Sequence, residues 1–264
     1  MSNARNLANL LGTNSTIQTA KIADAAVTNA KLENNISVDG TLTVTGATTL
    51  SSTLGVAGDS TFTGTTPTLT IGDGGAEDAK IIFDGNDYDF HFGLDDSADK
   101  LTIGRGSALG TTTSMTIDQE GNILKPLQPC FSIKKSGAQN NITAGGAAVT
   151  VTFDTEIFDQ GGDFASNTFT APVTGRYKIQ YTITVVQIDL DASEYNFRLA
   201  SSNRNYSNAL SPTPFDADTG NYPIVGTYMV DMDANDTVFL QIVCDGGSQL
   251  DVAADSYFSG FLVA

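Results

Sequence analysis

Side chains that commonly carry out catalysis are rare in this chain of 264 residues. It contains one histidine, His91, and two cysteines, Cys130 and Cys244. One histidine cannot form a multi-histidine metal site, and Cys244 has no histidine in its own segment to activate it. No glycine motif for phosphate or dinucleotide binding occurs. The 30 acidic residues leave a carboxylate pair for glycoside hydrolysis open, but we expect no catalytic residue and no enzyme activity.

The histidine and the cysteines have simpler structural explanations. His91 lies between Phe90 and Phe92, a spacing that predicts a polar residue alternating with apolar ones on a strand. Cys130 and Cys244 each lie in a strand-like run, and two cysteines do not make a disulfide framework. We favour two buried free thiols, with a single bridge as the alternative.

Two acidic clusters are the candidates for binding a cation. Residues Asp73–Asp78 and Asp95–Asp99 place carboxylates on turns, and calcium prefers such hard oxygen ligands. Neither cluster has EF-hand spacing. We therefore expect no metal and no cofactor, with calcium as the alternative and an acidic, solvated surface as the ordinary explanation.

The net charge of −17 limits the possible partners. A chain this acidic repels nucleic acid and anionic membranes. No stretch approaches the ~20 apolar residues of a membrane span, and no apolar leader core follows Met1. We expect no nucleic-acid binding and no membrane insertion, in a protein made in a cytosol.

The elements that position these residues are predicted to be strands, most clearly in residues 125–264. Tyr177, Ile179, Tyr181, Ile183 and Val185 alternate with polar residues, which indicates a strand with one buried and one wet face. Further strands are predicted at Tyr195–Leu199, Ile224–Val230, Val238–Val243 and Tyr257–Val263. Regular short strands separated by turn residues are typical of a sandwich or jelly roll.

A spaced set of aromatic, acidic and glycine residues marks the same region. Its members are Phe153, Asp159, Phe164, Phe169, Gly175, Tyr177, Tyr181, and near the end Phe258, Gly260 and Phe261. This pattern resembles the globular head of complement subcomponent q, a family that shares its trimeric jelly roll with tumour necrosis factor. The resemblance implies a homotrimer whose chains each contribute a jelly-roll head. Phe164 and Phe169 stand closer than is usual in that family, which implies a tighter turn.

Residues 38–66 carry a six-residue repeat. Gly40, Gly46, Ser52, Gly58 and Gly64 recur in one position, and Val44, Leu50, Val56 and Phe62 in another. One apolar residue in six cannot be buried within one chain, whereas three chains wound together can place that column on a shared axis. We predict an intertwined trimeric β shaft, with a flexible linker as the alternative.

Residues 67–124 are predicted to form a small β module rich in Asp and Gly. Between Asp73 and Glu120 it has 11 acidic residues against three basic ones, Lys80, Lys100 and Arg105. The expected strands are Leu69–Ile71, Lys80–Phe83, Tyr88–Phe92, Leu101–Ile103 and Met115–Ile117. This segment resembles a module of tailed-phage fibre proteins.

Residues 1–37 are predicted to form an attachment arm, extended or partly helical. Ile17, Ile22, Val27 and Leu32 recur every five residues, which fits neither a helix nor a strand. The arm also resembles the segments that join phage tail fibres to the particle, which implies tail or baseplate proteins as partners.

Contact residues for a receptor are expected on two loops of the head. Arg204, Tyr206, Phe215 and Tyr222 lie in the stretch 203–222, and Asp189 and Asp191 in the stretch 187–194. Tyrosine and arginine on a loop are good contacts for a protein or glycan. The alternative is that these loops pack on their own sandwich or on a neighbouring protomer.

Taken together, the sequence predicts an elongated, all-β homotrimeric fibre. We expect a bacteriophage tail fibre located in the virion and assembled in the host cytoplasm, whose head binds the host surface. A purely structural collar, head-fibre or baseplate trimer is the alternative, and a glycan-degrading enzyme is a third.

Overall fold

The computed structural model describes residues 38–264 except 144, 216, 218–219 and 248. Contacts divide the chain into two units, residues 1–68 and Leu69–Ala264, and each is described by itself. The predicted arm, residues 1–37, lies outside the described residues. Among the described residues, no helix has the length and apolar character required to cross a membrane.

Residues 38–68 form no helix or strand within the single chain. The repeat residues Val44, Leu50, Val56 and Phe62 are each more than half exposed. Against the described part of its own chain, the apolar column is therefore not buried. Whether it forms a trimeric shaft stays a prediction.

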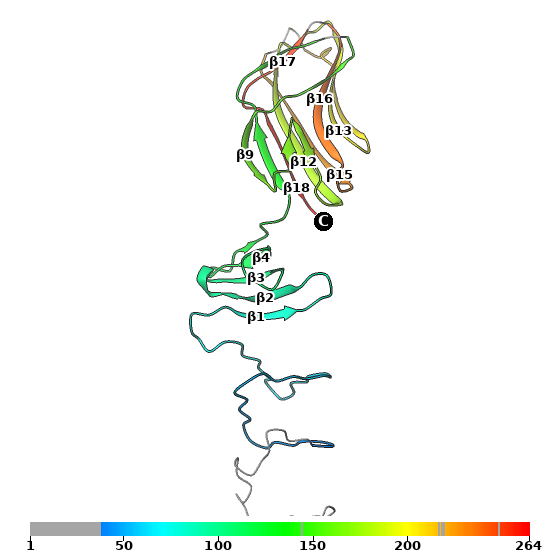
Figure 1. The fold of residues 1–264 in the computed structure, drawn as a ribbon. Coiled ribbons are helices and arrows are strands. Elements are labelled where there is room, and N and C mark those ends of the chain that lie inside the picture. The colour runs from blue at the N-terminus through cyan, green and yellow to red at the C-terminus, as the bar shows by residue number, and fades with distance from the viewer. Residues whose placement is uncertain (1–37, 144, 216, 218–219, 248) are drawn as a thin grey trace, which may run out of the picture. The chain divides into compact units, whose positions relative to one another are not determined.

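The second unit begins with an antiparallel sheet of five strands in sequence order (Figure 1). Its strands are β1 (Ala79–Phe83), β2 (Phe90–Asp95), β3 (Lys100–Arg105), β4 (Thr113–Ile117) and β5 (Ile123–Leu124), with the short 3₁₀ turn η3 (Asp96–Ala98) between β2 and β3. The strand expected at Leu69–Ile71 is absent, because these residues pair with no ladder. The second strand starts at Phe90 rather than Tyr88, since the preceding Asp- and Asn-rich residues form a turn.

The C-terminal part is a sandwich of two antiparallel sheets, which confirms the predicted all-β, jelly-roll-like head (Figure 1). One sheet contains β10 (Phe164–Ala165), β11 (Thr168–Thr170), β16 (Thr237–Gly246), β13 (Ala192–Ser201) and β14 (Asn205–Leu210), with β8 (Ala148–Thr150) beside β16. The other contains β7 (Gln139–Ile142), β17 (Leu250–Val252), β12 (Gly175–Val186), β18 (Tyr257–Leu262), β6 (Cys130–Lys134) and β9 (Thr155–Gln160), with β15 (Tyr222–Met232) on the other side of β12.

The core lies between the two sheets and follows the predicted alternation. On β12, Tyr177, Ile179, Tyr181, Ile183 and Val185 are buried, while the residues between them are half-buried or exposed. Phe131, Phe153, Phe164, Phe169 and Phe258 form a connected aromatic cluster against this strand. Full burial of one such side chain stabilises the fold by about 1.5–3 kcal/mol, so the alternation of β12 alone fixes which face packs inward.

The close spacing of Phe164 and Phe169 is explained by a two-residue hairpin. Phe164 pairs with Phe169 across β10 and β11, and Ser166 and Asn167 at the tip both have positive φ, at 51° and 67°. Two central residues with positive φ define the tight turn whose twist matches paired strands. The tighter turn implied by the sequence is therefore confirmed.

Asp159 is explained by the turn that precedes this hairpin. Its Oδ1 accepts a hydrogen bond from the backbone N–H of Asp163 at 3.1 Å, and its Oδ2 accepts one from Phe164 at 2.9 Å. The carboxylate thus closes the turn between β9 and β10 and places the Phe164 ring in the aromatic cluster.

Two expectations about the head are wrong in part. The stretch 203–222 is not one loop, because Asn205–Leu210 forms β14 and pairs with β13. Phe261, expected in the core, is 46 % exposed on the outer face of its sheet. The reason is the strand period of two, since Phe258 and Gly260 point inward on β18 and the residues between and after them point outward.

Candidate binding surfaces of the head

The head has two ends that can be told apart by where the chain enters. Leu262 donates a backbone hydrogen bond to the Pro129 carbonyl at 3.0 Å, and Val263 donates one to Arg176 at 2.8 Å. The chain entrance before β6, the C-terminus and the start of β12 therefore share one end, here the near end. The turns after β12, β14 and β16 lie at the other end, the far end (Figure 1).

Arg204 and Tyr206 meet at a polar cluster at the near end. The Arg204 guanidinium lies 2.9 Å from Oδ2 of Asp231, and the Tyr206 hydroxyl donates to Oδ1 of Asp231 at 3.3 Å. Partial burial, followed by the charge of Asp231, raises the pKa of Tyr206 above its usual range. Tyr206 therefore stays a neutral hydrogen-bond donor at any physiological pH.

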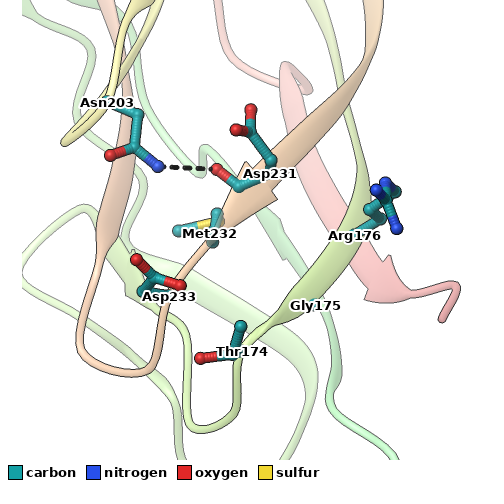
Figure 2. A pocket seen from close by; sticks show the side chains of 7 residues that line it. All are labelled: Thr174, Gly175, Arg176, Asn203, Asp231, Met232 and Asp233. Atoms are coloured by element: carbon teal, nitrogen blue, oxygen red, sulfur yellow. Dashed lines mark hydrogen bonds between the residues drawn. The ribbon is translucent and has the colours of Figure 1, made fainter.

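Beside this cluster lies a small open pocket of about 190 Å³, shown in Figure 2. Asn203 closes one side by donating its side-chain N–H to the Asp231 carbonyl at 3.0 Å, the dashed line in the figure. Thr174, Gly175, Arg176, Met232 and Asp233 complete the lining. Because the pocket is shallow and exposed, it suits a polar contact rather than an enclosed ligand.

Phe215 and Tyr222 are brought together at the far end. Their ring centroids are 5.4 Å apart in an edge-to-face arrangement, and both rings pack against the hydrophobic core. Nearby in the fold, the turn after β12 is closed by the Asp191 backbone N–H, which donates to Oδ1 of Asp189 at 2.8 Å. The Asp189 backbone N–H in turn donates to the Tyr195 hydroxyl at 2.9 Å.

The six expected contact residues therefore do not form one site. Arg204 and Tyr206 touch Asp231 near the end of β15, whereas Tyr222 begins that strand. Asp231 follows Tyr222 by nine positions on the strand, which at ~3.3 Å per residue places the two residues roughly 30 Å apart. A compact contact with a receptor would therefore use one group or the other.

The outer face of the seven-stranded sheet is a surface that the sequence prediction missed. Val225, Met229, Phe158 and Phe261 are all about half exposed there. A groove of about 270 Å³, lined in part by Cys130 and by both phenylalanines, crosses this face. The signal was present in the sequence, because apolar residues occupy outward positions of β15 and β18 where a wet face would carry polar ones.

The reactive residue types have structural roles. His91 is buried on β2, and its Nδ1 lies 2.8 Å from the Gly106 carbonyl, so Nδ1 carries a proton and donates. Its Nε2 has no hydrogen-bond partner within the described part of the chain. Cys130 and Cys244 form no disulfide, in line with the preferred reading of the sequence, although Cys130 is only half-buried. Burial raises the pKa of each thiol, which makes both poor nucleophiles.

The acidic clusters of the module cap their own turns. Asp73 accepts from the Gly75 N–H at 2.9 Å, and this bond, together with one involving Glu77, lowers the pKa of Asp73. Asp95 accepts from Ser97 at 2.8 Å and from the Ala98 N–H at 3.2 Å, which caps η3. Across the described residues, no group of three or more His, Cys, Asp or Glu is arranged to hold a metal ion. Calcium binding stays a prediction from the sequence alone.

Comparison with known proteins finds a family match in the head of this chain. The C1q domain family model matches residues 131–263, about half of the chain. The solved globular domain of zebrafish complement 1qA protein is similar at 21 % identity, with a TM-score of 0.39, over 52 % of this chain and 98 % of that one. A crystal structure of murine APRIL at pH 8.5 is similar at 6 % identity, with a TM-score of 0.38, over 52 % and 99 %. No curated protein matches.

Proposed function

The chain belongs to the C1q domain family, and from this premise we propose that it is a homotrimeric, non-enzymatic adhesin of a bacteriophage tail fibre. The observation that carries the trimer is the set of apolar side chains that one chain leaves in water. Val225, Met229 and Phe261 protrude from the outer face of the head, and Val44 and Phe62 from the repeat segment. Isolated soluble proteins rarely expose apolar patches beyond a few hundred Å².

Two identical chains beside the first would bury both the outer face of the head and the apolar column of the repeat segment. Three heads packed through the outer face of the seven-stranded sheet bring three copies of residues 38–66 together. The column Val44, Leu50, Val56 and Phe62 then lies on a common axis, as the six-residue repeat requires. Its glycines permit close approach of the three backbones.

The placement on a phage particle rests on the order of the segments. An arm at 1–37, a repeat segment at 38–66 and an acidic β module at 67–124 precede the head, and the first and third resemble parts of phage tail fibres. In this arrangement the arm binds tail or baseplate proteins and the far end of the head meets the host. Three modest contacts on one fibre reach useful strength through effective concentration.

The far end carries the proposed host contact. It lies opposite the chain entrance and includes Asp189, Asp191, Phe215 and Tyr222. Arg204 and Tyr206 lie at the near end, where the Asp231 carboxylate already engages them. We therefore assign receptor contact to the first group and a local, structural role to the second.

The test is competition for phage adsorption by the purified full-length chain. Light scattering first establishes whether its mass is three times 27.6 kDa, because a stable monomer would refute the proposal. The wild-type chain should block adsorption, Asp191→Lys at the far end should block it less, and the matched near-end variant Arg204→Gln should block as well as wild type. Equal competition by both variants would refute the assignment of the far end.

A structural collar or baseplate trimer is the second candidate, favoured by one observation. Phe215 and Tyr222 pack on their own core rather than standing free. If the trimeric wild-type chain leaves adsorption unchanged, this candidate replaces the adhesin. Incubation with host polysaccharide should release no reducing ends in either case.

A further inference from the structure

The five-stranded sheet of the module has an apolar face that its own chain leaves open. Directly opposite residues of neighbouring strands point to the same side, and Ile81 pairs with Phe92, which pairs with Ile103. The same side carries a row of exposed apolar residues on the outer strands and β2, here called the module face: Ile81, Phe83, Phe90, Phe92, Leu94 and Ile123.

The polar face of this sheet is the one that the chain covers. His91, Asp95 and Thr102 point to that side and are buried. The connection between β3 and β4 lies over them, since the Gly106 carbonyl accepts from His91 and a Cβ at Gly110 would lie 3.0 Å from Oδ2 of Asp95. A lone module is therefore inverted, with polar side chains inside and apolar ones in water.

The exposed area is too large for an isolated surface. Phe83, Phe90 and Phe92 are 63 %, 51 % and 40 % exposed, which at roughly 200 Å² per side chain leaves about 300 Å² of aromatic surface. With the aliphatic residues the face reaches roughly 500 Å², so three copies that turn this face toward a common axis would together cover on the order of 1,500 Å², which is in the range of a specific interface.

Within the described residues, the chain covers only one edge of the module face. Leu69 and Ile71 line a groove of about 280 Å³ with Ile81, Phe92, Leu94 and Leu101. Both remain largely exposed themselves. The centre of the module face stays open to a partner.

We propose that the module face packs against the same face of two other copies of this chain, as a second intersubunit interface; this rests on the proposed homotrimer. Only five residues, 125–129, separate β5 from β6, and five residues reach at most ~17 Å. Trimeric heads therefore hold three modules close together, at an effective concentration in the millimolar range.

The distribution of charge on the module leaves its apolar face nearly free of like-charge repulsion between copies. The module carries 11 acidic residues against three basic ones, but Arg105 is the one charged residue of the strand positions on this face, where it pairs with Phe90. Two acidic modules can therefore pack through this face without bringing their carboxylates close together. A cationic partner would instead be attracted to the acidic turns.

Single tryptophans test the interface directly, because the chain has none of its own. In the full-length chain, Phe92→Trp and Phe83→Trp report on the module face. Ile82→Trp is the control, since Ile82 neighbours Phe83 on β1, points to the opposite side and is 41 % exposed against 40 % for Phe92. Emission maximum, iodide quenching and light-scattering mass are measured for each.

The expected result is a trimeric mass with blue-shifted, iodide-shielded emission from Phe92→Trp and Phe83→Trp, and red-shifted, quenchable emission from Ile82→Trp. A trimeric mass with equal quenching at all three positions overturns the interface and leaves the proposed function standing. A monomeric mass overturns both. If either reporter variant misfolds by circular dichroism, trypsin cleavage after Lys100 and Arg105 in the wild-type chain decides, because a packed module resists it and an open one does not.

Discussion

At the scale of single residues, the residues that carry the resemblance to the C1q family have packing and hydrogen-bonding roles, not catalytic ones. A Cβ at Gly260 would lie 2.9 Å from Cε1 of the Phe131 ring, and one at Gly175 would lie 2.8 Å from the backbone carbonyl oxygen of Ala264. Both glycines are therefore required by close packing. Asp159 acts through its two backbone hydrogen bonds, not as an acid or base.

Asp154 gives a pH dependence whose direction follows from its partners. Ser136 donates to it twice, from Oγ at 2.8 Å and from the backbone N–H at 2.7 Å, which lowers the pKa of Asp154. A lowered pKa stabilises the fold above the ordinary range near pH 4, and this stabilisation is lost as pH falls through the folded value. Unfolding of the wild-type chain should therefore become easier below about pH 4 more steeply than that of Asp154→Asn.

Denaturant unfolding at a series of pH values measures this difference. Ser136→Ala is the control, since it removes one of the two donors and should flatten the slope in part. Parallel pH profiles for the wild-type chain and Asp154→Asn would contradict the prediction.

At the scale of elements, the hairpin between β10 and β11 depends on one side chain. Asn167 has a φ of 67°, and its Oδ1 accepts from the Phe153 N–H at 2.7 Å. Asparagine tolerates this left-handed conformation better than most residues, and a lost hydrogen bond leaves the half-buried Phe153 N–H without its acceptor.

We expect Asn167→Ala to lower the free energy of unfolding by about 1–3 kcal/mol. Asn167→Asp keeps both the acceptor and the tolerance for positive φ, so it should cost much less. Thermal denaturation of the two variants beside the wild-type chain makes the comparison. A loss of the same size in both would show that the side-chain acceptor is unimportant.

The long strands of the head were predictable from the sequence, and most of its short strands were not. The alternation of Tyr177 to Val185 predicted β12 and its buried face, and the strands predicted within β13, β15, β16 and β18 lie within a few residues of the observed ends. β14 was missed because Asn205–Leu210 does not alternate apolar with polar residues, and because its pairing with β13 is a contact that the local pattern does not encode.

At the scale of the whole molecule, charge opposes the proposed trimer and apolar surface favours it. Each chain carries a net charge of −17, so association brings like charges together. Salt shortens the screening distance from about 30 Å at 0.01 M to about 10 Å at 0.1 M.

The trimer should accordingly dissociate less on dilution as salt is raised. Light scattering over a dilution series at about 0.01 M and 0.1 M sodium chloride measures this. The mass of a covalently cross-linked trimer serves as the control for changes in the solvent. Weaker association at the higher salt would indicate that ion pairs, rather than apolar faces, hold the copies together.

The sequence by itself determined the all-β class, the head and its core, because strand alternation and aromatic spacing are local patterns tied to burial. Only the tertiary structure separated Arg204 and Tyr206 from Phe215 and Tyr222, since their distance depends on the length and pairing of β15. It also decided which side of the module sheet is open. Which face is exposed depends on the strand register and on where the β3–β4 connection packs, and the sequence of a single strand predicts neither.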